Sequence, residues 1–262
     1  RRVLFRSAAA DSDTGEADIA LFNGGGIRAD IASGDITYGD VLNVTPFGNT
    51  VSIIEVTGQT ILDELEHGAR HLPEESGGFL HTAGLTYTAD ARIPTPIVTD
   101  EHGMFIKVSG DRRVRDVLVN GEPIDPEKEY KVISISYVLL NEGDGHMFYD
   151  AKVLEPDFAL EIDLITDYIA NFDEIPEKYK EAEGRVKIIS SANTVDAECS
   201  NGIFTGLMSD GIIEWLGVPY AKSPERWKAP EAPENSDEYY DATYDRIYRI
   251  YCTARLSALL DN

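Results

Sequence analysis

The sequence predicts a mixed α+β fold, and three observations support this class. The apolar residues 19–22 run directly into a glycine turn and are typical of a short buried strand. Residues 60–70 and 157–172 each place apolar side chains at helical spacing. Between these helices, residues 76–140 consist of short segments rich in β-branched and aromatic side chains, which turn residues separate. We therefore expect helices and sheets together in one folded region.

Local signals place the remaining elements. Thr37 is a suitable N-cap for a short helix, and residues 50–56 alternate apolar and polar side chains as a strand does. Asn120-Gly121 is a hairpin signal. The helix at 157–172 ends before Pro176. Its expected core stripe is Phe158, Ile162, Leu164, Ile165 and Ile169. Further strands are expected at residues 79–80, 85–88, 104–108, 114–119 and 130–140.

Composition limits the partners. The chain has 262 residues, of which 42% are hydrophobic, enough for one large or two small domains. Its formal net charge of −24 argues against nucleic acid or an anionic membrane as a partner, because both need a basic face. An anionic ligand would therefore depend on a local arginine.

The two cysteines, Cys199 and Cys252, form no disulfide framework or CxxC metal motif, and a bridge between them stays open. No apolar run approaches 18 residues, so the sequence gives no ground for a transmembrane helix or a signal peptide.

The glycine turn is the first candidate site. It reads Asn23-Gly24-Gly25-Gly26-Ile27-Arg28 and follows the buried strand at once. Three glycines remove every Cβ, so the backbone can approach a ligand and point its amides at it, while Arg28 suits a phosphate or a carboxylate. The motif is neither GxxxxGK[ST] nor GxGxxG. The alternative is a strand-ending turn with a surface arginine.

Two further segments identify a family. One is Thr45-Pro46-Phe47-Gly48-Asn49-Thr50, and the other is Asn141-Glu142-Gly143-Asp144-Gly145-His146. Together with the glycine turn and the run ITYGDVLNVTPFGNTVSIIEVTGQTILDELEHGAR, they resemble the C-terminal, substrate-binding domain of the 5′-nucleotidase family over about residues 8–189. The resemblance implies a layered α/β/β/α sandwich. It also implies a separate N-terminal metallophosphoesterase domain, in which two divalent metal ions activate a water molecule and hold the phosphoryl oxygens.

The resemblance assigns roles to individual residues. Arg28 would hold a phosphate oxygen, Asn23 would donate to the base or ribose, and Phe47 would stack on the base. His146 stands where the family places a second stacking aromatic, so we expect an altered base preference, with Phe148 or Tyr149 compensating. The full predicted substrate-binding set is Asn23, Gly25, Arg28, Phe47, Gly48, Asp144, His146 and Asp150.

Some of these roles have plain alternatives. Asp150 lies one residue from the position at which the family presents a carboxylate to the ribose hydroxyls. Asp144 and Asp150 could both be turn residues, and Phe47 could be a hydrophobic anchor.

Metal binding by this chain is not expected. No GNH or HxH cluster occurs, and the five histidines are scattered without the pattern that a dinuclear centre requires. His67 and His71 stand four apart on a predicted helix, but a zinc site needs more ligands, so we expect exposed histidines near a helix end. No catalytic residue and no cofactor is assigned here. Hydrolysis by this chain alone is not expected.

The two ends of the chain differ from its centre. Residues 1–7 are interpreted as a truncation or assembly remnant, and residues 190–193 as a linker. Residues 194–233 resemble the opening of a type B carboxylesterase, through Gly217-Val218-Pro219-Tyr220-Ala221 and Arg226-Trp227-Lys228-Ala229-Pro230, but no GxSxG follows. A stand-alone fold for residues 194–262 is not expected, because few short strands bury little area.

The functional prediction is the nucleotide-binding part of a metal-dependent 5′-nucleotidase-type phosphoester hydrolase. Two alternatives stay open: a non-catalytic nucleotide-binding module, and a truncated chimera with a carboxylic ester hydrolase. The family also contains UDP-sugar hydrolases and cyclic phosphodiesterases, so the substrate is open. By resemblance, the location is the periplasm or outside the cell.

Overall fold

The computed structural model describes residues 15–179, 182–209, 212–219, 239–243 and 251–257. It divides into two compact units, residues 1–188 and residues 189–262, which are described separately here. The predicted remnant at residues 1–7 and the esterase-like segment 226–230 lie outside the described residues. Within the described residues, no helix is long and apolar enough to cross a membrane.

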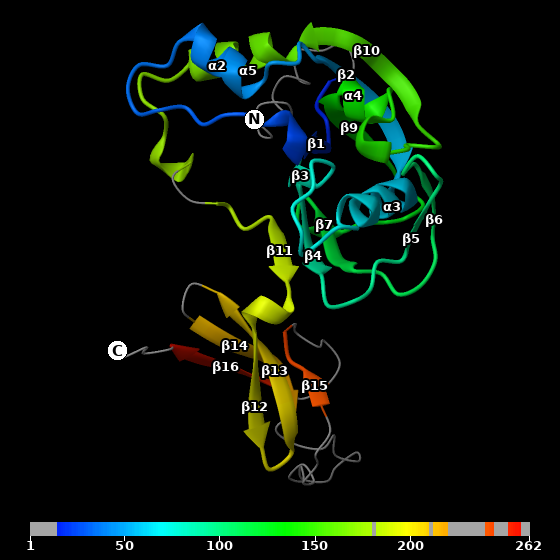
Figure 1. Ribbon diagram of the computed structural model, residues 1–262, viewed down its shortest axis with the longest axis vertical. Helices are drawn as coiled ribbons and strands as arrows, with labels where there is room; N and C mark the ends of the chain where they lie inside the picture. Colours follow the sequence, from blue (N-terminus) through cyan, green and yellow to red (C-terminus); the bar gives the residue numbers. More distant parts are fainter. Residues whose placement is uncertain (1–14, 180–181, 210–211, 220–238, 244–250, 258–262) are drawn as a thin grey trace. The chain divides into compact units, whose positions relative to one another are not determined.

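A five-stranded mixed sheet forms the centre of the first unit (Figure 1). Strand β1 runs parallel to β9, and the other neighbouring strands are antiparallel. The parallel pair is important for function, because it brings the carboxyl ends of β1 and β9 to the same edge of the sheet. The sheet order is β10 (Lys152–Leu160), β2 (Thr50–Thr57), β9 (Glu129–Ile135), β1 (Ile19–Asn23) and β3 (Leu80–Ala83).

The strands of this sheet supply many side chains to the hydrophobic core of the first unit. All five residues of β1 are buried, and Ile19, Leu21 and Phe22 are among the largest fully buried side chains. Burial on both faces explains why β1 is a continuous apolar run rather than an alternating one. The predicted strands at residues 19–22 and 50–56 are both confirmed.

A second, four-stranded sheet and a two-stranded ribbon complete the unit. Asn120 and Gly121 both have positive φ angles, 52° and 91°, so the predicted hairpin turn is confirmed. The ribbon strand β5 was not predicted from the sequence. The second sheet has the order β11 (Val186–Ile189), β4 (Leu85–Asp90), β7 (Val114–Val119) and β8 (Glu122–Pro123), and the ribbon pairs β5 (Ile97–Thr99) with β6 (Phe105–Val108).

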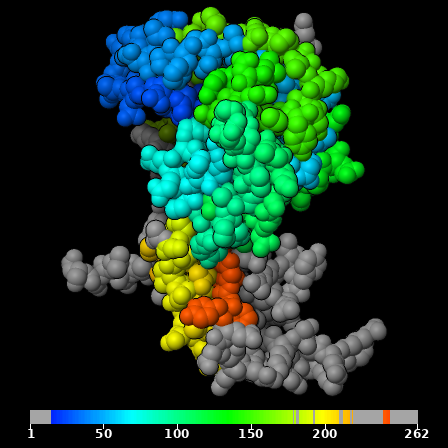
Figure 2. Space-filling model, turned by 45° about the vertical axis from the view of Figure 1, so that its right-hand side comes forward, coloured from blue at the N-terminus to red at the C-terminus, as the bar shows by residue number. Residues whose placement is uncertain are grey.

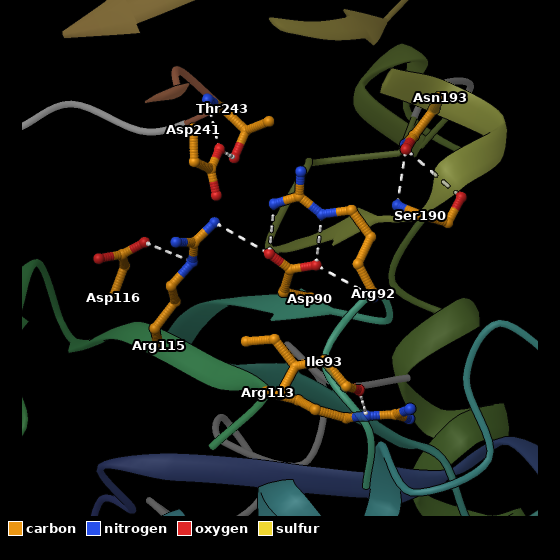
Figure 3. A network of polar contacts seen from close by, with 10 residues as sticks. All are labelled: Asp90, Arg92, Ile93, Arg113, Arg115, Asp116, Ser190, Asn193, Asp241 and Thr243. Atoms are coloured by element: carbon orange, nitrogen blue, oxygen red, sulfur yellow. Dashed lines mark hydrogen bonds and ion pairs between the residues drawn. The ribbon is translucent and has the colours of Figure 1, made fainter. Parts of the chain in front are cut away.

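An ion-pair cluster closes the end of β4 (Figure 3). The buried Asp90 carboxylate accepts from Arg92 Nε at 2.8 Å and from Arg92 Nη2 at 2.6 Å. Arg115 Nη2 approaches the same carboxylate at 3.5 Å. The bidentate geometry fixes the side chain of Arg92 on Asp90.

Helix α3 (Gly58–Gly68) contacts β2, β6 and β7 and buries Ile61 and Leu65. It begins two residues before the predicted start, because the Thr57 side chain accepts from the Thr60 amide and acts as the N-cap. The expectation that its histidines are exposed was wrong for His67, which is fully buried.

Helix α2 (Tyr38–Val44) begins at the predicted cap. The Thr37 hydroxyl accepts from the Asp40 amide, and the Asp40 carboxylate accepts from the Thr37 amide at 2.8 Å, which makes a capping box. The Thr37 hydroxyl also donates to the Asp40 carboxylate, and this bond, together with the bond from the Thr37 amide, holds the pKa of Asp40 below its usual value. Helix α2 lies beside α5 (Glu161–Ile169), and their blue and green atoms adjoin in the space-filling view (Figure 2).

We expect Thr37→Ala to lower the free energy of unfolding by about 1 kcal/mol, because it removes the side chain that caps α2. Urea denaturation measures this change. Thr37→Ser keeps the hydroxyl and is the matched control. An unchanged midpoint for the alanine variant would show that the cap contributes nothing measurable.

Two predicted boundaries were wrong. Residues 136–139 form helix α4 (Ser136–Leu139), where the strand was predicted to continue to residue 140. Residues 157–160 belong to β10, where a helix was predicted. A short apolar run fits a strand and a buried helix equally well, and the pairing of β10 with β2 exists only in the tertiary fold. The one-turn 3₁₀ helices are η1 (Gly24–Gly26), η2 (Gly143–Gly145), η3 (Glu177–Tyr179) and η4 (Ser191–Asn193).

The described residues of the second unit form a β-sheet, and whether residues 194–262 fold on their own stays a prediction. Its strands pair in the order β12-β13-β14-β16, and β15 pairs with β13. Phe204 stacks on Tyr240 with ring centroids 5.1 Å apart, and Trp215 donates to the Phe204 carbonyl at 2.9 Å. Cys199 is an exposed free thiol. The strands are β12 (Thr194–Cys199), β13 (Gly202–Ser209), β14 (Ile212–Pro219), β15 (Tyr239–Asp241) and β16 (Tyr251–Ser257).

Candidate functional site

A pocket of about 360 Å³ lies in the first unit, at one edge of the five-stranded sheet. Five of the eight predicted site residues line it, namely Asn23, Gly25, Arg28, Phe47 and Asp144. Its complete lining is Asn23, Gly25, Gly26, Arg28, Phe47, Asn49, Gly77, Ile135, Tyr137 and Asp144.

The sheet topology explains why these segments meet. Strands β1 and β9 are parallel, so both end at this edge, the first at Asn23 and the second at Ile135. Strands β2 and β3 run antiparallel to them, so both begin here. The segments that precede those two strands supply Phe47, Asn49 and Gly77 to the same pocket. Loops at one sheet edge are a common place for ligand binding.

Arg28 and Phe47 form one wall. The guanidinium carbon of Arg28 lies 6.0 Å from the centroid of the Phe47 ring, at the edge of cation–π range. The Arg28 amide donates to the Val44 carbonyl at 3.0 Å, which ties the glycine turn to the end of α2. The Phe47 side chain is 58% exposed, a large fraction for a phenylalanine. A flat ligand can therefore reach its face.

The glycine turn is shaped by its neighbours rather than by a ligand. The Gly24 and Gly25 amides donate to the carbonyls of Phe79 and Gly77, at 2.9 Å and 2.8 Å, so these two amides do not point at a ligand as the sequence predicted. A Cβ on Gly26 would lie 2.7 Å from the buried Phe22 ring. Close packing against Phe22 therefore explains Gly26.

Asp144 supplies the carboxylate of the pocket. Its Oδ2 accepts from Asn23 Nδ2 at 2.7 Å, and its Oδ1 lies 3.4 Å from the Tyr137 hydroxyl. Burial and the charge of Asp144 raise the pKa of Tyr137, so the phenol stays protonated and donates. Asn23 Oδ1 is buried without a hydrogen-bond partner in the described structure. An acceptor of this kind suits an N–H or O–H group of a ligand.

The turn that carries Asp144 is strained. Glu142 and Asp144 both adopt left-handed backbone conformations, with φ of 55° and 57°. Such conformations cost about 1–3 kcal/mol each and are kept where the surroundings determine them. The Asp144 carbonyl accepts from Arg70 Nη2 at 3.1 Å and lies 3.2 Å from His67 Nε2. The end of α3 and the turn after it therefore hold the Asp144 turn in place.

His146 is not in the pocket, and the prediction that it stacks on a base was wrong for this structure. Its side chain is fully buried, with Nδ1 2.7 Å from Glu64 Oε2 and Nε2 2.8 Å from the Gly78 carbonyl. A buried glutamate attracts the imidazole inward, because both groups need a polar partner once they leave water. Phe148 is also buried, and Tyr149 contacts Asp63 through its hydroxyl at 3.1 Å, so neither replaces His146 in the pocket lining.

Gly48 and Asp150 also lie outside the pocket lining. Gly48 has φ of 64°, so its place after Phe47 is explained by the turn. The Asp150 carboxylate accepts from the Thr57 hydroxyl at 2.6 Å, at the opposite end of β2 from the pocket.

Sequence reasoning missed Tyr137, Asn49 and Gly77. Tyr137 was placed inside a predicted strand, whereas it stands on the short helix α4 and is 40% exposed. A glutamate, Glu161, anchors Asn49 through a 3.1 Å bond to its Nδ2. The parallel pairing of β1 with β9 is the signal that could have found Tyr137, and it appears only in the fold.

The described residues do not fit a dinuclear metal centre. Among them, no group of three or more histidine, cysteine, aspartate or glutamate side chains is arranged to hold a metal ion. A two-metal phosphoesterase site requires several such ligands around each ion. No catalytic step is therefore derived through a metal within this chain.

The fold and the pocket define the class of this protein. It is an α+β domain whose pocket presents an exposed ring, an arginine and a carboxylate at the edge of one sheet. The description "5′-nucleotidase, C-terminal domain" matches residues 4–151. The chain belongs to the 5′-nucleotidase C-terminal domain family, so the predicted family is confirmed, as is the α+β class.

Relatives support this assignment. Protein UshA of Escherichia coli (strain K12) is 33% identical over 144 residues, which cover 55% of this chain and 22% of UshA. The 5′-nucleotidase of Rattus norvegicus is 30% identical over 180 residues, which cover 67% of this chain and 29% of that protein. The crystal structure of a 5′-nucleotidase precursor from Thermus thermophilus superimposes with a TM-score of 0.59 at 30% identity, over 72% of this chain and 35% of that one. The chain thus matches between 22% and 35% of the length of these three relatives.

Proposed function

We propose that this chain binds the nucleotide substrate of a 5′-nucleotidase-type phosphoester hydrolase. The observation that carries the proposal is the meeting of Arg28, Phe47 and Asp144 in one pocket, from three separate segments of the chain. A nucleotide offers one partner for each of them: an anionic phosphate, a flat base, and hydroxyl or amino donors.

The three contacts differ in chemistry. Phe47 offers an exposed face for stacking, which is tolerant of the kind of base. Arg28 offers a cation in a chain whose net charge is −24, so attraction of a phosphate has to be local. Asn23 and Asp144 offer hydrogen-bond acceptors, and these discriminate between ligands more sharply than stacking does, because unpaired buried acceptors are costly.

In this proposal, hydrolysis of the phosphoester takes place on a domain other than the one described here. We place the two divalent metal ions and the attacking water on a separate metallophosphoesterase domain, since the described residues supply no such ligand set. The periplasm or the cell exterior is the proposed location, by family. The alternative is a nucleotide-binding module without catalysis, and the two differ in whether phosphate is released when a metallophosphoesterase domain is joined to this chain.

The test is calorimetric titration of the whole chain with AMP and with adenosine in the presence of EDTA. We expect Arg28→Ala to weaken AMP binding about tenfold, the equivalent of one charge-assisted hydrogen bond. Adenosine binding should change less than about twofold, because it carries no phosphate. Arg92→Ala is the matched control, since Arg92 is held on Asp90 and does not line the pocket.

Two outcomes would contradict the proposal. If neither AMP nor adenosine binds at millimolar concentration, the pocket does not hold a nucleotide. If Arg28→Ala weakens AMP and adenosine equally, Arg28 shapes the pocket but does not hold the phosphate.

A further inference from the structure

A buried polar cluster lies directly beneath the pocket. Its members are Glu64 and His67 on α3, Arg70 in the turn that follows this helix, and His146. Glu64, His67 and His146 are fully buried, and the rings of His67 and His146 lie 5.0 Å apart. None of these side chains lines the pocket.

His146 joins two segments through its two ring nitrogens. The Gly78 carbonyl can only accept, so His146 Nε2 carries a proton and donates to it. A second proton then lies between His146 Nδ1 and Glu64 Oε2 and is covalently bonded to one of the two atoms. Both hydrogen bonds are inaccessible to water, so the loss of either partner leaves a buried polar atom unpaired.

The clamp formed by Glu64 and His146 connects to the glycine side of the pocket. Gly77, next to Gly78, lines the pocket and accepts from the Gly25 amide at 2.8 Å. A fixed Gly78 carbonyl therefore fixes the segment on which the glycine turn rests.

The same clamp connects to the acidic side of the pocket. His146 follows the strained turn Gly143–Gly145 directly in the chain. A Cβ on Gly78 would lie 3.0 Å from Asp144 Cβ, so the Gly78 segment and the turn touch. From the turn after α3, Arg70 Nη2 donates to the Asp144 carbonyl at 3.1 Å. The backbone of Asp144 is thus held by groups outside the pocket lining, and this fixes the place from which its carboxylate reaches Asn23.

We propose that Glu64 and His146 are positioning residues, which set ligand affinity by holding Asp144 and the Gly77–Gly78 segment in place. This inference rests on the proposed nucleotide pocket for its affinity readout, but it also predicts a ligand-independent property. Because Asn23 Nδ2 donates to the Asp144 carboxylate, the side-chain amide protons of Asn23 report where Asp144 lies.

The experiment compares Glu64→Leu with Glu64→Gln in the whole chain. Glutamine can donate its Nε2–H to the bare Nδ1 of a neutral His146, so the clamp survives, whereas leucine breaks it. We expect Glu64→Leu to weaken AMP binding about tenfold per folded molecule and Glu64→Gln to change it less than about threefold. In NMR spectra, slow exchange of the Asn23 side-chain amide should be kept by Glu64→Gln and lost in Glu64→Leu.

The matched control is Glu66→Gln. Glu66 is also fully buried on α3, but its carboxylate accepts from the Arg113 and Val114 amides at 2.9 Å and 3.0 Å and has no link to the pocket. Its substitution should lower stability without lowering AMP affinity per folded molecule. A double variant, Glu64→Leu with Asp144→Asn, should lose much less than the sum of the two single losses, because both act through one carboxylate.

Several results would overturn the inference. One is a Glu64→Leu variant that loses stability but binds AMP as the unmodified chain does. Another is additive losses in the double variant. If Glu64→Leu does not fold, saturation of the unmodified chain with AMP must slow exchange of the His146 Nε2 proton, since coupling is reciprocal, and no change refutes the clamp. If the unmodified chain binds no ligand, the proposed function fails, and the Asn23 amide exchange still decides the clamp.

Discussion

Phe47→Ala is expected to weaken binding of both AMP and adenosine by about 2 kcal/mol, roughly thirtyfold, the size of a lost stacking contact. The ring is 58% exposed, so most of its face is available to a base. Because stacking does not involve the phosphate, the two ligands should lose affinity by the same factor. Titration calorimetry of the whole chain measures both.

Tyr38→Ala is the matched control for this experiment. Tyr38 is an aromatic residue with 56% exposure at the first turn of α2, and it does not line the pocket. Its loss should leave both affinities within about twofold of the unmodified chain. If Phe47→Ala binds adenosine as well as the unmodified chain does, Phe47 is a hydrophobic anchor and the base lies elsewhere in the pocket.

The sequence predicted the parts of the site that depend on local signals. Arg28 and Phe47 stand in turns flanked by glycine or proline, and exposed functional side chains are common in such turns. The buried strand that ends at Asn23 was likewise readable as an apolar run. These features need no partner from elsewhere in the chain, so short motifs describe them, and the resemblance to the family supplied the roles of Arg28 and Phe47.

The parts that were missed depend on long-range pairing. Tyr137 enters the pocket because β9 lies parallel to β1, and β10 continues through residue 160 because it pairs with β2. His146 turns inward because Glu64 stands 82 residues earlier on a helix that the sequence could not place beneath the loop. By motif alone, position 146 is expected to hold an aromatic residue that stacks on the base. Only the fold shows that the buried carboxylate of Glu64 binds the side chain at this position.

The same buried cluster predicts a pH-dependent stability. Burial, together with interactions with His146 and Arg70, lowers the pKa of His67 from 6.5 to about 3. The carbonyl of Asp144 opposes this shift, and His71 adds to it slightly. His67 Nε2 faces that carbonyl at 3.2 Å, while its Nδ1 is buried without a partner in the described structure, so the neutral form is the one that fits.

The sign of the effect follows from which state takes up the proton. Below pH 6.5 the unfolded chain protonates His67, whereas the folded chain does not until about pH 3. The stabilisation is therefore complete above pH 6.5 and falls as the pH drops toward 3, by about 1.4 kcal/mol per unit. At pH 5 the loss attributable to His67 is about 2 kcal/mol relative to pH 8.

His67→Gln isolates this contribution. The glutamine Nε2 can still donate to the Asp144 carbonyl, and it does not titrate. Urea denaturation at pH 8 and at pH 5 should show a loss in the unmodified chain that exceeds the loss in the variant by about 2 kcal/mol. Both proteins carry the same other titrating groups, so the difference between the two losses reports His67. Equal losses would mean that the imidazole takes up its proton in the folded chain as readily as in the unfolded one, and that α3 does not exclude a charge beneath Asp144.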